Sequence, residues 1–230
     1  MKIAIFYHNY QLNNHPNIPI EYWHMMYEDQ MRSLAISGLL GVCEFIHIGI
    51  NGEVVPEWTP KANVVLHPRS EWSMGETATL KAIRDFCSKE ESQDFNILYI
   101  HQKGLKDIIN LASRHWRLMM EYFTIHRWKD CVEYLREYDC VGVNWLTDTF
   151  VGRKPHFSGN FWWATARHIN TLDNSYLENQ PNLSPLINVL NKEFWIGSNP
   201  VTKAKEIHCS NFGEAGHYSN LYSSGNYITI

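Results

Sequence analysis

The sequence lacks any long hydrophobic run. No apolar stretch approaches the roughly 20 residues that a helix needs to cross a bilayer. The start of the chain, Met1–Phe6, predicts a short strand rather than the apolar region of a signal peptide. An excess of positive charge is also missing: the net charge is −4 and no basic stripe occurs, which argues against nucleic acid as a partner. We therefore expect a soluble protein, for which peripheral membrane contact stays open.

Paired cysteines and common metal motifs are absent as well. The 5 cysteines are an odd number and include no CxxC pair, which favours free thiols and a cytoplasmic location. Despite 12 histidines there is no HExxH motif, so a zinc site of a common type is not expected. Glycine-rich loops of the GxGxxG or Walker type are missing too, so phosphate binding by one of these loops is not expected.

Strand-like apolar runs alternate with helical patterns along the whole chain, and no linker or repeat interrupts them. This alternation predicts an α/β fold of one domain, residues 1–230, with a mostly parallel central sheet and helices on both faces. Strands are expected at 3–7, 43–50, 64–66, 97–100 and 140–143, and helices at 20–40, 76–87, 116–138 and 183–191. The pattern leaves open whether 161–166 is a strand or the start of a helix.

The stretch Asn96–Gly104 carries the strongest local signal. Its apolar run, 97–100, predicts a buried strand that ends on His101 and Lys103. Ligands of open α/β sheets bind just beyond the carboxyl ends of the strands. A histidine and a lysine beside Gly104, which lets backbone approach closely, suit an anionic ligand such as a diphosphate. The alternative is a strand that ends in a solvated turn.

A second unusual stretch places Ser158, Gly159 and Asn160 directly before three aromatic residues. Small residues open space at the backbone, and the amide of Asn160 offers both a donor and an acceptor. Trp162 or Trp163 offers a flat face for stacking on a sugar ring. The alternative is a turn followed by ordinary core aromatics.

Two carboxylates are candidate general bases. Glu193 lies in the otherwise apolar segment 191–197. A carboxylate in such surroundings either has a raised pKa or is held by partners, and both can produce a general base. The alternative is an exposed glutamate at a helix end. Asp148, which follows the strand at 140–143, is the second candidate, and the two together would also suit a hydrolase.

These segments together resemble a family of small glycosyltransferase-like proteins of cell-surface polysaccharide, rhamnan-type, synthesis and their viral relatives. Residues 100–104, Ile-His-Gln-Lys-Gly, resemble the family's Tyr-x-His-Thr-Lys-Gly motif, and 156–164 resemble its Phe-Ser-Gly-Asn-Phe-Trp-Trp-Ala block. Residues 76–80 resemble its Glu-x-x-Thr-Leu helix start, 116–123 the following helix, and 193–197 its Glu-x-Trp-Ile segment. The matches follow in order over more than half of the chain.

The resemblance implies a GT-A-like domain that transfers a sugar from a nucleotide-diphospho-sugar donor to a glycan or another hydroxyl acceptor, with an inverting mechanism. Glu193 is then the expected base and Asp148 the fallback. The residues implied at the nucleotide sugar are Tyr7, His8, Asn9, His101, Lys103, Gly104 and Arg117. Those implied at the sugar or acceptor are Ser158, Gly159, Asn160, Trp162 and Trp163.

One departure from the family's fold class concerns the metal. The chain contains no Asp-x-Asp, the usual carboxylate site for Mn²⁺ or Mg²⁺ in GT-A enzymes. Either Lys103, helped by Arg114 or Arg117, neutralises the diphosphate without metal, or His101 joins another ligand to hold a softer divalent ion. Candidates for that other ligand are Asp148 and His208. The departure also motivates an alternative function, a non-catalytic glycan- or nucleotide-binding module that keeps the fold.

Overall fold

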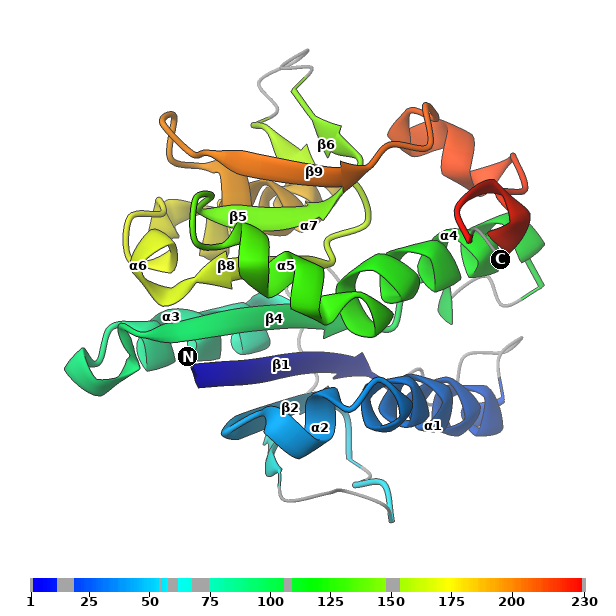
Figure 1. The fold of residues 1–230 in the computed structure, drawn as a ribbon, viewed down its shortest axis with the longest axis horizontal. Coiled ribbons are helices and arrows are strands. Elements are labelled where there is room, and N and C mark those ends of the chain that lie inside the picture. Colours follow the sequence, from blue (N-terminus) through cyan, green and yellow to red (C-terminus); the bar gives the residue numbers. More distant parts are fainter. Residues whose placement is uncertain are drawn as a thin grey trace.

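The computed structural model of the protein describes residues 2–11, 19–53, 55–57, 62–67, 75–105, 109–147 and 154–228. Seven strands form one central sheet in the order β3-β2-β1-β4-β8-β5-β9 (Figure 1). All neighbouring strands pair in parallel except β8, which runs antiparallel to both β4 and β5. The strands are β1 (Lys2–Tyr10), β2 (Phe45–Asn51), β3 (Asn63–His67), β4 (Phe95–His101), β5 (Cys140–Val143), β8 (Trp162–Thr165) and β9 (Ala204–His208). Two further short strands, β6 (Trp145–Leu146) and β7 (His156–Phe157), pair with each other.

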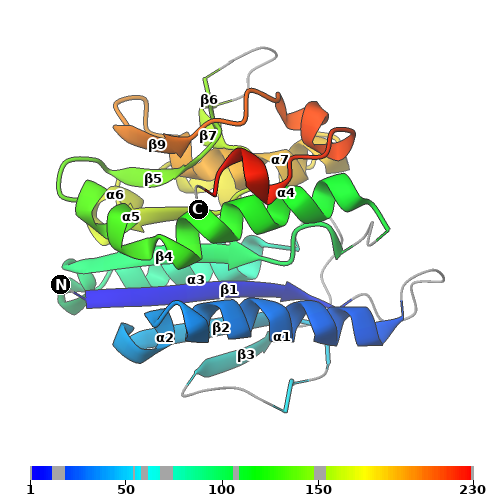
Figure 2. The ribbon, with the colours of Figure 1, turned by 45° about the vertical axis from the view of Figure 1, so that its right-hand side comes forward.

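Helices cover both faces of this sheet (Figures 1 and 2). On one face lie α1 (Ile20–Ile36), α2 (Leu39–Val42), α4 (Leu111–Glu121) and α5 (Trp128–Tyr134). On the other lie α3 (Thr77–Cys87) and α6 (Ala166–Ile169). Helix α7 (Pro185–Phe194), expected at 183–191, begins after the N-cap Ser184 and has proline in its first turn, where its missing N–H costs nothing. The predicted α/β architecture with a mostly parallel sheet is thus confirmed. None of the described helices is long and apolar enough to cross a membrane.

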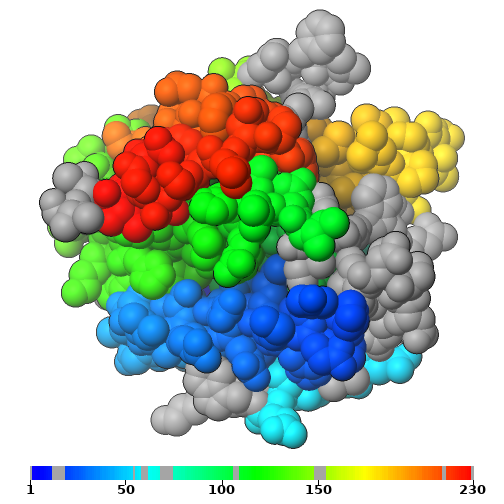
Figure 3. Space-filling model, turned by 90° about the vertical axis from the view of Figure 1, so that its right-hand side faces the viewer, coloured from blue at the N-terminus to red at the C-terminus, as the bar shows by residue number. Residues whose placement is uncertain are grey.

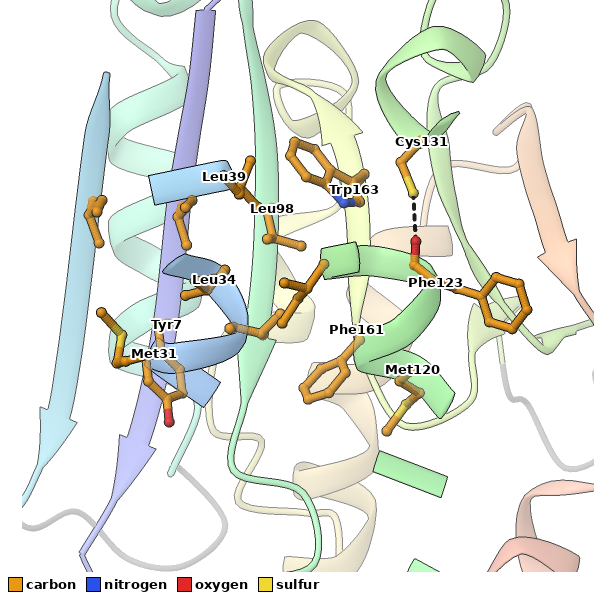
Figure 4. Close-up of a cluster of buried hydrophobic side chains, with 14 of the residues drawn as sticks. Tyr7, Met31, Leu34, Leu39, Leu98, Met120, Phe123, Cys131, Phe161 and Trp163 are labelled. Carbon is orange, nitrogen blue, oxygen red and sulfur yellow. Dashed lines mark hydrogen bonds between the residues drawn. The ribbon is translucent and has the colours of Figure 1, made fainter. Parts of the chain in front are cut away.

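The alternation of side chains along each strand divides the core into two clusters. In β1, Ile5 and Tyr7 pack toward α1 and α4, whereas Phe6 packs toward α3. Figure 4 shows part of the first cluster, in which Tyr7 and Trp163 come from different strands of the sheet. Burying one such large apolar side chain stabilises the fold by on the order of 1.5–3 kcal/mol. The apolar contacts on both faces of the sheet therefore stabilise the packing of the helices against it.

The single helix expected at 116–138 is divided into three helical segments in the structure. Helix α4 passes into a π-helical turn, Tyr122–His126, before α5 begins. A π turn contains one extra residue, and the apolar positions of the sequence slip by one residue here, between Phe123 and Trp128. The carbonyl of Thr124 within the turn accepts a hydrogen bond from the indole of Trp163 at 2.8 Å. The π turn is therefore hydrogen-bonded to strand β8 of the central sheet.

Three other segments differ from the sequence pattern or were left open by it. The helix expected at 20–40 breaks at Gly38, whose φ of 77° is left-handed, so that α1 and α2 are separate. The segment 161–166, undecided from its pattern, is strand β8 followed at once by α6. Edge strand β9 was not expected, because its sequence, Ala-Lys-Glu-Ile-His, has neither an apolar run nor an alternating pattern.

Candidate functional site

The parallel strands all end on one side of the sheet, which faces the viewer in Figure 3 and is called the carboxyl edge below. His8 of β1 is in register with His101 at the end of β4. Strand β8 runs the opposite way, with Trp162 beside Tyr99, so Asn160, just before β8, lies at this same edge. Segments that are far apart in the sequence are thereby brought together where α/β sheets bind ligands.

Glu76, the residue before α3, stands at the centre of this edge. Its Oε2 accepts hydrogen bonds from the Tyr99 hydroxyl at 2.8 Å and the Asn160 amide at 2.7 Å. Its Oε1 lies 3.6 Å from Nδ1 of His101. Burial acts to raise the pKa of Glu76, but the neighbouring His101 and His8 and the Tyr99 hydrogen bond outweigh it, so its pKa is lowered. Glu76 is therefore a fixed carboxylate at neutral pH.

His101 is oriented by the turn that precedes β8. Its Nε2 lies 2.9 Å from the carbonyl oxygen of Gly159, and because a carbonyl can only accept, Nε2 carries a proton. Nδ1 then faces Glu76. Gly159 has a φ of 90°, and a Cβ there would lie 2.5 Å from Sδ of Met120, so this turn requires glycine. The Ser-Gly-Asn turn thus sets the direction of the His101 ring.

Lys103 supplies the positive charge of the site. Its Nζ lies 3.9 Å from Oε1 of Glu193, 4.3 Å from the centre of the Trp116 ring and 5.6 Å from that of Tyr218. Burial acts to lower the pKa of Lys103, but the carboxylate of Glu193 and the hydrogen bond with Tyr218 outweigh it, so its pKa is raised. The ammonium is held between a carboxylate and two aromatic rings.

Asn9, near the end of β1, has a buried and unpartnered side-chain amide. Its side chain is 0% exposed, yet neither its Nδ2 nor its Oδ1 has a hydrogen-bond partner within the described part of the chain. A buried polar group left in this state costs about 1–3 kcal/mol. Such groups in a native fold call for an explanation, and a ligand that bonds the amide is one. The hydroxyl of Ser158 is in the same state.

The two tryptophans expected to stack on a sugar are placed in the core instead. Trp162 and Trp163 are both 0% exposed and belong to the clusters on opposite faces of the sheet. The expected stacking role is therefore wrong for this arrangement, since neither ring presents a face to a ligand. Asn160 is also engaged, because its Oδ1 accepts from the Trp162 indole at 2.8 Å while its Nδ2 donates to Glu76. Its role is to position Glu76.

Two residues expected at the nucleotide are likewise buried within the fold. The Tyr7 side chain is 0% exposed, and its hydroxyl donates to Gln30 at 2.7 Å. Arg117, 5% exposed, pairs with Glu121 one helical turn away at 2.7 Å. An arginine that already holds a buried carboxylate is not free to clamp a diphosphate.

Two of the expected metal ligands, His101 and His208, do not come together. His208 stacks on Phe123 at 4.5 Å and hydrogen-bonds the Tyr222 hydroxyl at 2.9 Å. Strands β8 and β5 separate its strand, β9, from the strand that carries His101. Asp148 lies outside the described residues. Within the ranges that the structure describes, no group of three or more His, Cys, Asp or Glu side chains is placed to hold a metal ion.

Sequence reasoning missed several residues of the site. Glu76 entered only as the start of a helix, although an acidic residue before a helix that follows a strand is a signal for this edge. Tyr99 was counted as part of a buried strand, and Trp116 as part of a helical apolar face. Tyr218 lies in the C-terminal region, where no motif pointed to it.

A surface hollow of about 380 Å³ lies at the opposite edge of the sheet, between Tyr138, Thr165 and Asn199. Its polar groups already have partners: His168 bonds the Ile196 carbonyl at 3.0 Å, and Asp139 accepts from the Lys203 amide. It therefore lacks the unpartnered buried groups that mark the carboxyl edge.

His8 makes the stability of the fold depend on pH. Its Nδ1 lies 2.9 Å from the Thr79 hydroxyl, and burial lowers the pKa of His8 from 6.5 to about 3. Below pH 6.5 His8 is protonated in the unfolded chain but stays neutral in the folded one. The free energy of unfolding therefore falls as the pH drops from about 6.5 towards 3. At pH 5 this contribution amounts to about 2 kcal/mol. We expect His8→Gln to remove that share of the pH dependence in urea unfolding at pH 7 and pH 5. Equal pH dependence in both proteins would contradict it.

A family model described as a domain of unknown function, DUF8361, matches residues 55–181, more than half of the chain. The chain belongs to the DUF8361 family. The DUF8361 match includes Glu76, Lys103 and Asn160 and ends before Glu193. No curated protein matches the chain.

Proposed function

We propose that this DUF8361 protein is a glycosyltransferase with a GT-A-like fold. It would move a sugar from a nucleotide-diphospho-sugar to a hydroxyl of a glycan acceptor, in surface polysaccharide synthesis. The proposal is carried by the Lys103–Glu193 pair just after β4 and by the unpartnered Asn9 near the end of β1, both at the carboxyl edge of the sheet, where α/β folds bind ligands. The ordered motif resemblance described above supports the same function.

In this proposal the acceptor oxygen attacks the anomeric carbon as the bond from that carbon to the diphosphate breaks. The diphosphate leaves with the bonding electrons, and the ammonium of Lys103 stabilises its charge. The acceptor's proton passes to Glu193, whose side chain is 9% exposed. This is a single displacement, which inverts the anomeric configuration. Both ring nitrogens of His101 already face protein oxygens. His101 therefore holds Glu76 in place and does not bind the diphosphate.

The described residues do not fit a diphosphate-bridging metal ion. Hard cations take several oxygen ligands. One oxygen of Glu76 already accepts two hydrogen bonds, and Lys103 places a fixed positive charge beside Glu193. A second cation next to that ammonium would be repelled. We therefore route no step of the reaction through a metal.

The alternative is a non-catalytic module that binds a glycan or a nucleotide. It is favoured by the pairing of Lys103 with Glu193 and by the full engagement of the Asn160 amide. The Lys103–Glu193 pair and the Asn160 amide then stabilise the structure around a bound ligand and take no part in a reaction.

Thermal unfolding with a panel of nucleotide sugars, each with and without Mn²⁺, tests the proposal. We expect one nucleotide sugar to stabilise the fold, by about 2.7 kcal/mol at a concentration 100-fold above its dissociation constant. Asn9→Ala should weaken that binding about tenfold, because the ligand loses its hydrogen bonds to the amide. Asn63→Ala, at an exposed position at the amino end of β3, is the matched control.

The outcomes separate the two functions. Stabilisation by free glycans alone would favour the binding module over the transferase. Equal binding of the nucleotide sugar by Asn9→Ala and the unaltered protein would remove Asn9 from the site.

A further inference from the structure

Tyr218 is an exposed aromatic side chain at the rim of the site. It ends a short 3-10 helix, Glu214–Tyr218, in the C-terminal segment, which lies beside α4 in both ribbon views (Figures 1 and 2). In the view onto the carboxyl edge, that segment and the start of α4 adjoin at the surface (Figure 3). The Tyr218 side chain is 47% exposed, whereas Trp116, 5.3 Å away and nearly perpendicular to it, is buried. Tyr218 is thus the outer ring of an aromatic pair.

The backbone around this ring is held at several points. The carbonyl of Tyr218 accepts from the Asn110 side chain at 3.0 Å. The preceding residue, His217, is 0% exposed and stacks on Trp116 at 4.6 Å with an angle of 17°. Its Nε2 lies 2.8 Å from the hydroxyl of Ser210. Because the neighbouring residues are fixed, a ligand that packs on the ring orders little additional chain.

The polar groups of the site lie directly beside this ring. The Lys103 ammonium is 5.6 Å from the ring centre, and Glu193 is 3.9 Å from that ammonium. An apolar ring next to one donor and one acceptor matches a pyranose, which has a face of C–H groups and a rim of hydroxyls. Trp162 and Trp163, the rings to which the sequence pointed, are buried and do not offer such a face.

We propose that Tyr218 is the platform on which the sugar ring of the acceptor stacks, with its reacting hydroxyl bonded to Glu193. This names the acceptor side of the proposed transferase site and so rests on that function. It also places the acceptor hydroxyl next to Glu193, the group that is to take its proton. The C-terminal segment, outside the DUF8361 match, then supplies the acceptor subsite.

Saturation-transfer NMR on the full chain tests the platform without any need for turnover. The probes are the methyl glycosides of glucose, galactose, rhamnose and N-acetylglucosamine. We expect at least one to bind the unaltered protein and its affinity to fall about threefold to tenfold in Tyr218→Ala. Tyr218→Phe and Tyr218→Trp keep a stacking face and should bind within about twofold of the unaltered protein. Tyr134→Ala, at a tyrosine of α5 that is 38% exposed, is the matched control and should change nothing.

The results distinguish this proposal from the transferase itself. Unchanged affinity in Tyr218→Ala, or failure of every glycoside to bind the unaltered protein, overturns the platform even if a nucleotide sugar stabilises the fold. Weakened affinity in Tyr218→Trp as well as in Tyr218→Ala also overturns it, because stacking would then not be the cause. Loss on Tyr218→Ala alone supports the platform. If no nucleotide sugar binds, the transferase and its acceptor role fail, and Tyr218 is then the sugar platform of the binding module.

Discussion

Replacing Glu193 with glutamine should abolish sugar transfer and leave donor binding nearly unchanged. Glutamine keeps the shape of the side chain and leaves an oxygen near Lys103, whose Nζ lies 3.9 Å from Oε1 of Glu193, but it cannot take up a proton. A positioned general base contributes about 10²–10⁴-fold to the rate. We therefore expect kcat to fall by about that factor in Glu193→Gln. Turnover with the stabilising nucleotide sugar measures the first effect, and calorimetric titration measures donor affinity.

A carboxylate outside the site provides the control. Glu178 pairs with Lys81 at the surface, where the Glu178 side chain is 56% exposed, and Glu178→Gln should affect neither quantity. Equal loss of transfer and donor binding in Glu193→Gln would show that Glu193 is structural. Undiminished transfer would move the base elsewhere, and Asp148 is the second candidate from the sequence.

Replacing Lys103 with methionine should both destabilise the fold and remove donor binding. The Lys103 and Glu193 side chains are 10% and 9% exposed, so the change removes the Lys103 cation from beside a buried carboxylate. Breaking a buried pair from one side costs about 3–5 kcal/mol. Methionine retains an apolar stem against the Trp116 ring, so the lost charge dominates the effect. Urea unfolding measures the free energy of unfolding, and calorimetry measures donor affinity.

An exposed ion pair gives the comparison. Lys81→Met removes a lysine whose side chain is 31% exposed, and it should cost about 0–1 kcal/mol. The double variant Lys103→Met/Glu193→Gln removes both buried charges and should regain much of the lost stability without regaining transfer. A Lys103→Met protein that is as stable as the unaltered one and binds the donor equally well would contradict this account of the site.

Much of the fold could be predicted because its signals are local. The apolar run before His101 becomes β4, and the one-residue slip in the long helical pattern becomes a π turn. The helix expected at 183–191 is α7, which has proline in its first turn. Each of these depends on residues within a few positions of one another, which is the range over which sequence periodicity is informative.

The assignment of Trp162 and Trp163 shows where local signals end. Adjacent residues of a strand point to opposite faces of a sheet. Because β8 lies between β4 and β5 with helices on both faces, both rings are covered. The same two residues in an edge strand, or in a sheet open to solvent on one side, would have left a ring exposed. Their sequence is compatible with either outcome.

The sequence by itself determined that a strand ends on His101 and Lys103, because an apolar run, polar residues and a glycine follow one another there. It could not determine which groups those side chains meet. Glu76 bonds Asn160 from 84 positions away, and Lys103 meets Glu193 and Tyr218 from still more distant segments. These partners are set by the order of strands in the sheet and by the path of the C-terminal segment over α4. Only the tertiary structure fixes both, because they depend on the packing of the whole chain.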